Sequence, residues 1–275
     1  MKKLPALLCI LLFVLIFKTA SAQKEYIEVI YSITYHRGIA DTKPTARKAV
    51  LIIKPNSGSN YALKNLIISD SIYNAHLANP PKEIKLTGAY YDEFRELIKK
   101  DYSSKKLDVT CKGSGIADNN YYNYKQDINL NWTPSEGLDS LLGYACQKAT
   151  VSYMGRDYVA WYAPELPISD GPWKFHGLPG LILRVYDTQN IFDFKVFSIK
   201  EVNSDITQDL FKNAKKIIPI THEAYWKENK YRTENPKDVI IAKYGDGTFN
   251  GVKISDPNSK KARIFNRLET DFIKE

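Results

Sequence analysis

The residues best suited to chemistry gather between positions 169 and 176. Ser169, Asp170 and His176 are the side-chain types of an acyl-transferring hydrolase, which works only where the three groups converge in space. The sequence has no G-x-S-x-G turn, the arrangement that exposes the nucleophilic serine in one large class of hydrolases. We therefore assign no catalytic residue and favour a protein without enzymatic activity. A secreted hydrolase using His176 and Asp170 is the alternative.

Two basic residues near this stretch have acidic neighbours with which they could pair. Arg156 and Lys174 could each form an ion pair with Asp187 or Asp170. Such pairs would give these four groups a structural role.

Neither a metal nor a cofactor is predicted. The four histidines, at positions 36, 76, 176 and 222, do not pair at the spacing of metal ligands, and no C-x-x-C motif occurs. Gly113 and Gly115 form a lone G-x-G, which no helix signal follows.

Two cysteines, Cys111 and Cys146, remain once residues 1–22, which have the organisation of a signal peptide, are set aside. An exported protein can form a disulfide between such residues. Cysteine is also among the residue types most often buried as a thiol. The sequence leaves both alternatives open.

Glycine and proline dominate the stretch that contains the candidate chemistry. Residues 171–180 hold three glycines and two prolines, which predicts a rigid corner because proline fixes φ and glycine admits unusual backbone. Leu178-Pro179-Gly180 is typical of a type II turn, with glycine at the position of positive φ. The residues assigned to this structural motif are Gly171, Pro172, Gly177, Leu178, Pro179, Gly180, Leu181 and Ile182.

The hexapeptide GLPGLI at 177–182, after GPWKF at 171–175, resembles the signature of the GLPGLI family, a group of exported bacterial proteins of unknown function. The segments at 144–150, 155–156 and 160–162 resemble the block upstream of that signature, so the resemblance covers residues 132–187. It implies an exported Gram-negative protein, often encoded near outer-membrane transporter genes, and no established reaction.

Aromatic side chains are concentrated between residues 158 and 197. Such rings can line a pocket for an apolar or amphipathic ligand, and they can equally fill a hydrophobic core. If they line a pocket, the ligand-binding residues would be Trp161, Trp173, Phe175, His176 and Arg156.

The first 22 residues have the organisation of a signal peptide. Lys2 and Lys3 precede an apolar run at 7–17, and Ala20-Ser21-Ala22 supplies the small residues before a cleavage site. The run is too short to cross about 30 Å of hydrocarbon comfortably. We expect an exported chain that does not span the membrane and that resides in the periplasm or at the outer membrane, with secretion as an alternative.

The charge of the chain argues against a nucleic-acid partner. The net charge of +8 falls to +5 without the leader, because Lys2, Lys3 and Lys18 leave with it. The lysine doublets at 105–106, 215–216 and 260–261 are scattered, whereas a nucleic-acid face would concentrate them.

Periodicity predicts many strands and few helices. Alternating or apolar runs predict strands at 26–35, 49–54, 128–132, 146–151, 156–162, 181–186, 191–199 and 239–241. Helical spacing predicts helices at 90–98, 210–218 and 221–231. The apolar stretches at 61–68 and 71–75 are ambiguous between strand and helix. Sequential strands with short connections favour antiparallel pairing.

We therefore predict a mainly β (α+β) fold, with a single, strongly curved antiparallel sheet or partly open barrel and two or three short helices. It would form one domain over residues 23–275, with a loop-rich extension from about residue 244. The predicted function is that of an exported binding or accessory protein. Its expected partners are a hydrophobic small molecule, a peptide or a lipid, and an outer-membrane transporter.

Overall fold

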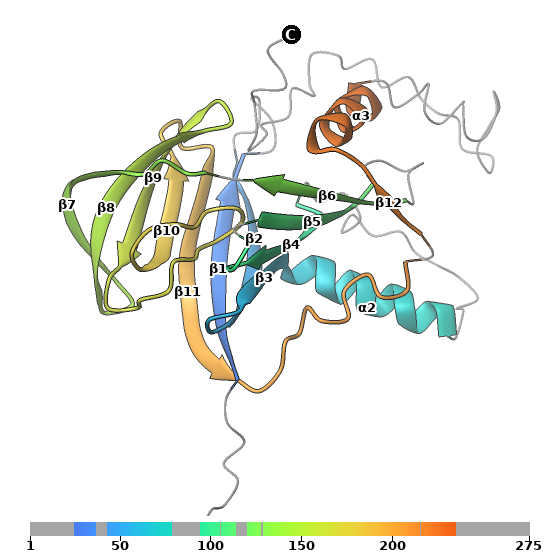
Figure 1. Cartoon of the computed structure of the whole chain (residues 1–275), viewed down its shortest axis with the longest axis horizontal. Helices are drawn as coiled ribbons and strands as arrows, with labels where there is room; N and C mark the ends of the chain where they lie inside the picture. The colour runs from blue at the N-terminus through green and yellow to red at the C-terminus, as the bar shows by residue number, and fades with distance from the viewer. Residues whose placement is uncertain are drawn as a thin grey trace, which may run out of the picture.

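The computed structural model describes residues 25–36, 43–78, 94–104, 106–113, 120–127, 129–214 and 216–234. The predicted signal peptide, the strand predicted at 239–241 and the extension from residue 244 lie outside these residues. Within them, twelve strands form one sheet in the order β12-β6-β5-β4-β3-β2-β1-β11-β10-β9-β8-β7 (Figure 1). The strands are β1 (Tyr26–Tyr35), β2 (Thr45–Lys54), β3 (Gly58–Leu63), β4 (Glu96–Asp101), β5 (Lys106–Lys112), β6 (Tyr121–Asp127), β7 (Thr133–Leu141), β8 (Tyr144–Tyr153), β9 (Arg156–Ala163), β10 (Leu181–Asp187), β11 (Phe192–Val202) and β12 (Ile217–Pro219).

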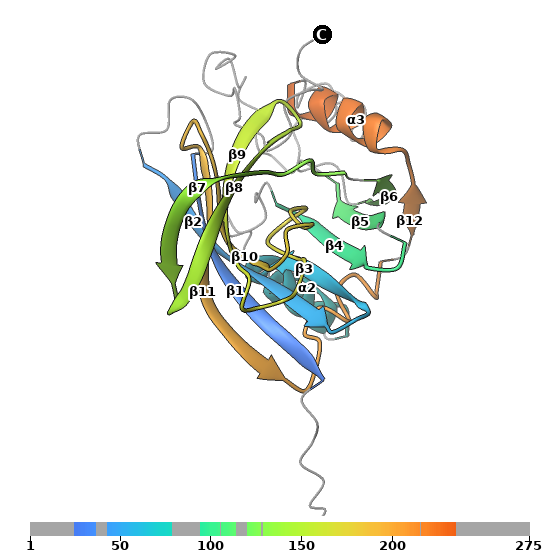
Figure 2. The same ribbon diagram turned by 60° about the vertical axis from the view of Figure 1, so that its left-hand side comes forward.

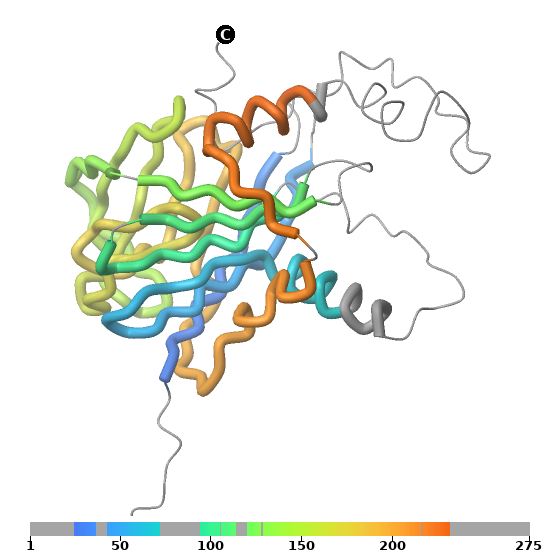
Figure 3. The backbone as a smooth tube through the Cα atoms, turned by 45° about the vertical axis from the view of Figure 1, so that its right-hand side comes forward, coloured from blue at the N-terminus to red at the C-terminus, as the bar shows by residue number. Residues whose placement is uncertain are grey.

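The sheet is open, with β7 at one end and β12 at the other. Every neighbouring pair is antiparallel except β12 and β6, which are parallel. The sheet curls strongly, so that β3 to β6 face the strands β8 to β10 across the interior (Figures 2 and 3). The prediction of a mainly β fold with one curved sheet is confirmed, and the parallel pair makes the sheet mixed.

Alternation along the strands divides the sheet into an inner and an outer face. In β11, Phe192, Phe194 and Val196 are buried, whereas Lys195 and Phe197 between and after them are exposed. The inner faces form one large core that is rich in rings. This is the two-residue period that burial of one face imposes on a strand.

Two helices accompany the sheet in the described residues. Helix α2 (Lys64–Ala78) covers the outer face of β2, where Ile67 packs on a small cluster of Ile30, Val50 and Ile52. Helix α3 (His222–Glu234) lies over β6, and the ring of Tyr225 is 5.5 Å from that of Tyr124.

Three predicted elements are wrong. Residues 96–98, the described end of the helix predicted at 90–98, belong to β4. Leu97 and Ile98 are adjacent and both buried, so this strand lacks the alternation of apolar and polar residues and its pattern resembles the apolar face of a helix. The strand predicted at 128–132 is displaced, because the tyrosine-rich stretch itself forms β6 and the next strand starts at Thr133. In the range of the helix predicted at 210–218, residues 210–213 form turns in which Phe211 has a φ of 66°, and Ile217 and Ile218 belong to β12.

Candidate functional site

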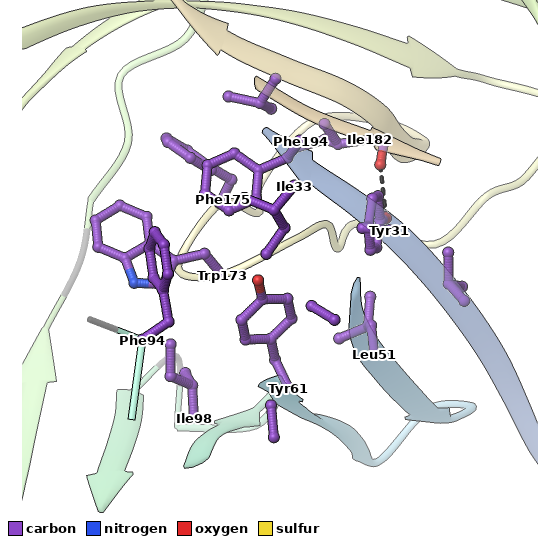
Figure 4. Packing of buried hydrophobic residues seen from close by; sticks show 14 of the residues in the cluster. Tyr31, Ile33, Leu51, Tyr61, Phe94, Ile98, Trp173, Phe175, Ile182 and Phe194 are labelled. Atoms are coloured by element: carbon purple, nitrogen blue, oxygen red, sulfur yellow. Dashed lines mark hydrogen bonds between the residues drawn. The ribbon is translucent and has the colours of Figure 1, made fainter. Parts of the chain in front are cut away.

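The connection between β9 and β10, residues 164–180, lies inside the curve of the sheet (Figure 2). Its Phe175 is fully buried and meets the rings of Tyr158 at 4.8 Å, Trp173 at 5.4 Å and Phe194 at 6.3 Å. Figure 4 shows Trp173 and Phe175 pointing into the core toward Phe94 and Phe194. The connection therefore fills the concave side of the sheet.

The corner combines positive φ values at Trp173 and Gly177, of 51° and 97°, with tight packing at Gly180. Gly180 does not have a positive φ, so the predicted type II turn is wrong. Its N–H instead donates to the carbonyl of Leu178 at 2.8 Å, a γ-turn around Pro179. A Cβ at Gly180 would lie 2.3 Å from the carbonyl oxygen of Ala163. Glycine is needed there because the backbone of β9 approaches so closely.

Asp170 is the centre of a buried polar network. Its carboxylate, which is fully buried, accepts hydrogen bonds from Ser59 Oγ at 2.5 Å, Lys100 Nζ at 2.5 Å and Tyr102 Oη at 2.6 Å. It also accepts the N–H of Gly171 at 2.6 Å. The Lys100 ammonium donates further to the carbonyls of Gly171 and Phe175, at 2.7 and 3.2 Å. The connection is thus tied to β3 and β4 by charge-assisted bonds.

Burial governs the ionisation of this network. Desolvation lowers the pKa of Lys100, and the nearby Asp170 carboxylate opposes that decrease. Desolvation, followed by the charge of Asp170, raises the pKa of Tyr102. Tyr102 is therefore a hydrogen-bond donor throughout the physiological range.

Lys174, the second buried lysine, contacts residues of β6 and the ring of Trp173. Its Nζ donates to Gln126 Oε1 at 2.9 Å and to Tyr124 Oη at 3.3 Å, and it lies 5.2 Å from the centre of the Trp173 ring. The cation that pairs with Asp170 is Lys100. The sequence could not have selected Lys100 over Lys174, because residues 90–98 were interpreted as a helix whose end attracts lysines.

His176 and Asp170 are not joined as a catalytic pair in the hydrogen bonds of the described residues. The ring Nδ1 of His176 donates to the carbonyl of Lys174 at 2.9 Å, and its own carbonyl accepts the indole N–H of Trp132 at 2.8 Å. Desolvation, and then the charge of Lys100, lower the pKa of His176. The hydrogen bond to the Lys174 carbonyl acts in the opposite direction and raises the pKa, so burial and the charge of Lys100 are what favour the neutral ring. The two hydrogen bonds fix the position of the loop.

The expected pairing of Arg156 with Asp187 is confirmed. The guanidinium lies 3.2 Å from Asp187 Oδ2, and both groups are buried. The other carboxylate oxygen of Asp187 accepts the N–H groups of Ile191 and Phe192, which closes the turn between β10 and β11. Arg156 also donates to Gln189 at 2.9 Å.

The two cysteines are separate buried thiols, so the disulfide alternative is wrong. Cys111 lies on β5 and Cys146 on β8, near opposite ends of the strand order. Cys146 Sγ donates weakly to the carbonyl of Tyr144, and Cys111 interacts with the hydroxyl of Tyr225.

The five residues proposed as a ligand wall occupy different environments. Trp173, Phe175 and Arg156 are buried, and His176 is half-buried. Trp161 is half-buried on the outer face of the sheet, opposite Lys148 and Arg184 of the neighbouring strands. The structure therefore brings together the rings of the connection and leaves Trp161 on another surface.

In the described residues, no group of three or more histidine, cysteine, aspartate or glutamate side chains could hold a metal ion. No helix of that part of the chain is long and apolar enough to cross a membrane.

A family model described as "Protein of unknown function (Porph_ging)" matches residues 155–184. The match covers β9, the connection that fills the concave side and the start of β10. The chain thus carries a segment typical of a family without a known function. No curated protein matches the chain.

Solved structures similar to this chain include two crystal forms of PNGF-II. They are 13% and 15% identical, with TM-scores of 0.52 and 0.51, and each alignment covers 76% of this chain. The chain spans about a third of the length of those structures, 34% and 33%, and the likeness is one of fold alone. A LolA superfamily protein from Nitrosomonas europaea is 8% identical over 70% of this chain and 92% of that one, but its TM-score of 0.27 is too low to support an argument.

Proposed function

We propose that the chain is an exported binding or accessory protein that docks on a protein partner through the hairpin of β7 and β8. The leader predicted at 1–22 supports export to the periplasm or the outer membrane. The resemblance of residues 177–182 to the GLPGLI signature suggests an outer-membrane transporter as the partner.

A strained leucine at the tip of this hairpin carries the proposal. Leu142 and Gly143 form its two-residue turn, with φ values of 52° and 85°. Such turns normally use asparagine, aspartate or glycine first, because a leucine side chain destabilises the left-handed conformation. Leu142 is 52% exposed, so little burial offsets this cost. Strain at an exposed apolar residue is the kind of outlier that points to function.

A second leucine extends the apolar surface of the same hairpin. Leu138 is 85% exposed on β7, immediately after an irregularity in the pairing between Ser135 and Leu138. The hairpin also forms one end of the sheet, where β7 has no strand beyond it in the described residues (Figure 2). Exposed apolar side chains at a sheet edge are typical of a surface that meets another protein.

The buried polar groups of the connection support binding over catalysis. Asp170 and His176 each have structural hydrogen-bond partners, and neither is exposed enough to meet a substrate freely. A hydrolase would need this pair at an accessible site.

The test is site-specific photo-cross-linking in cells of the source organism. A photo-reactive side chain at Ser140, which is exposed on the hairpin, should give one cross-linked protein of defined mass. The same group at Thr188, exposed in the turn after β10, should not. Excess untagged wild-type protein should abolish the product, whereas excess Leu142→Asn protein should not. Docking through the hairpin would be contradicted if positions 140 and 188 gave the same cross-linked product, or if the Leu142→Asn protein competed as well as the wild type.

A further inference from the structure

The outer face of the sheet carries a row of six residues on six neighbouring strands, and four of them are cations. Register places Lys48 of β2 opposite Ser32 of β1, and Ser32 opposite Lys195 of β11. The row continues from Lys195 to Arg184 of β10. Trp161 of β9 and Lys148 of β8 then complete it. At about 4.8 Å between strands, the row is about 24 Å long along the sheet.

Three of these cations are available to a ligand. Lys48 and Lys195 are exposed and Lys148 is half-buried, and the described residues give none of the three an ion pair. Arg184 differs, because its guanidinium forms two hydrogen bonds with Asp193, at 2.8 and 3.0 Å. The row itself contains no acid, and the acids that act on Arg184 are Asp193 and Asp139.

Aromatic rings accompany the cations. The ammonium of Lys148 is 5.9 Å from the centre of the Trp161 ring, and that of Lys48 is 3.6 Å from the centre of the Phe197 ring. Phe197 is 57% exposed. Gly137 of β7 makes room for Trp161, since a Cβ there would lie 3.1 Å from the edge of the indole. The outer face thus combines flat apolar surfaces with positive charge.

We propose that this row binds an acidic polysaccharide. Carboxylate, sulfate or phosphate groups along such a chain would pair with the three lysines, and the apolar faces of its sugar rings would stack on Trp161 and Phe197. The shape of the surface favours a chain over a membrane, because the outer face of a curled sheet is convex (Figure 2). A flat lipid surface would touch only part of the row, whereas a linear polyanion can follow it.

The row meets the docking hairpin at Lys148 of β8, but the inference does not depend on docking, because Leu142 at the tip of the hairpin is not part of the row. The experiment measures binding of polygalacturonate and heparin to the full exported chain, with neutral dextran as a control. We expect both acidic polymers to bind, with affinity that falls as salt is added, and dextran not to bind. The Leu142→Asn protein should bind them as the wild type does.

Substitution of the row separates specific binding from general attraction. The triple variant Lys48→Gln, Lys148→Gln, Lys195→Gln should bind polygalacturonate about tenfold or more weakly, since each exposed charge contributes a few-fold. A matched triple variant with the same loss of charge on exposed lysines elsewhere, Lys99→Gln, Lys125→Gln, Lys216→Gln, should change affinity by much less. Trp161→Ala, which leaves the net charge unchanged, should also weaken the binding of polygalacturonate relative to the wild type.

Three results would overturn the proposal. One is equal loss of affinity in the two triple variants, with both folded by circular dichroism. Another is that single-stranded oligothymidylate binds more tightly than polygalacturonate and loses as much affinity in the triple variant of the row. The last is binding confined to vesicles of anionic phosphatidylglycerol.

Discussion

The ammonium of Lys100 on β4 lies 2.5 Å from the carboxylate of Asp170 in the connection between β9 and β10, and both side chains are almost fully buried. The two residues are 70 positions apart in the sequence. Their contact holds the connection inside the sheet, where its rings complete the core. A buried ion pair of this kind fixes geometry even where its net stabilisation is small.

Removing one partner of this pair should be strongly destabilising. Lys100→Met leaves the Asp170 carboxylate buried without its cation, and we expect a loss of about 3–5 kcal/mol in the free energy of unfolding. Lys106→Met is the matched control, because Lys106 pairs with Asp127 at 3.8 Å on the surface. Urea unfolding measures both variants. A Lys100→Met protein as stable as the control would show that the pair does not hold the connection.

The two glycines of the GLPGLI stretch should respond differently to alanine. In Gly180→Ala the new methyl group would meet the Ala163 carbonyl, and we expect a loss of about 3 kcal/mol or more. Gly177 has a φ of 97° and its nearest neighbour would be Trp132 at 3.8 Å, so Gly177→Ala should lose only about 1 kcal/mol. Thermal unfolding compares them. The reverse order would indicate that dihedral strain matters more than close packing at this corner.

The environment of His176 predicts a dependence of stability on pH. Burial lowers its pKa in the folded protein, so the unfolded chain takes up a proton at higher pH than the folded chain does. The contribution of His176 is therefore fully present above pH 6.5, the value for an ordinary histidine, and is lost as pH falls through the folded pKa.

Urea unfolding at about pH 7.5 and about pH 5.5 tests this dependence. The wild type should lose more stability between the two conditions than His176→Gln, in which this titration is absent. The same loss in both proteins would show that other groups control stability in this range.

Local periodicity was sufficient to predict much of the sheet. The strands predicted at 26–35, 181–186 and 191–199 agree with β1, β10 and β11 within a few residues, because each alternates or is bounded by turn residues. β4 was missed since Leu97 and Ile98 are both buried, which removes the alternation. Runs buried on both faces carry no periodic signal that separates strand from helix.

The candidate site was only partly predictable. The rigid corner at 171–180 follows from its glycines and prolines, and the ion pair of Arg156 with Asp187 was among the expected pairings. The partners of Asp170 were not found, because Ser59, Lys100 and Tyr102 come from β3 and the end of β4, and no local pattern joins them to the connection. The cation row is likewise created by strand register, since its members are scattered from residue 48 to residue 195.

Substitution of Leu142, at the tip of the hairpin of β7 and β8, should raise stability and reduce docking. Leu142→Asn should raise the free energy of unfolding by about 1 kcal/mol, since asparagine adopts the left-handed conformation more readily than leucine does. The same variant should lose the cross-link formed from Ser140. Met154→Asn is the matched control, because Met154 has a φ of 48° before Gly155 in the turn between β8 and β9. It should keep the cross-link, and a Leu142→Asn protein that also keeps it would remove the functional reason for the strained leucine.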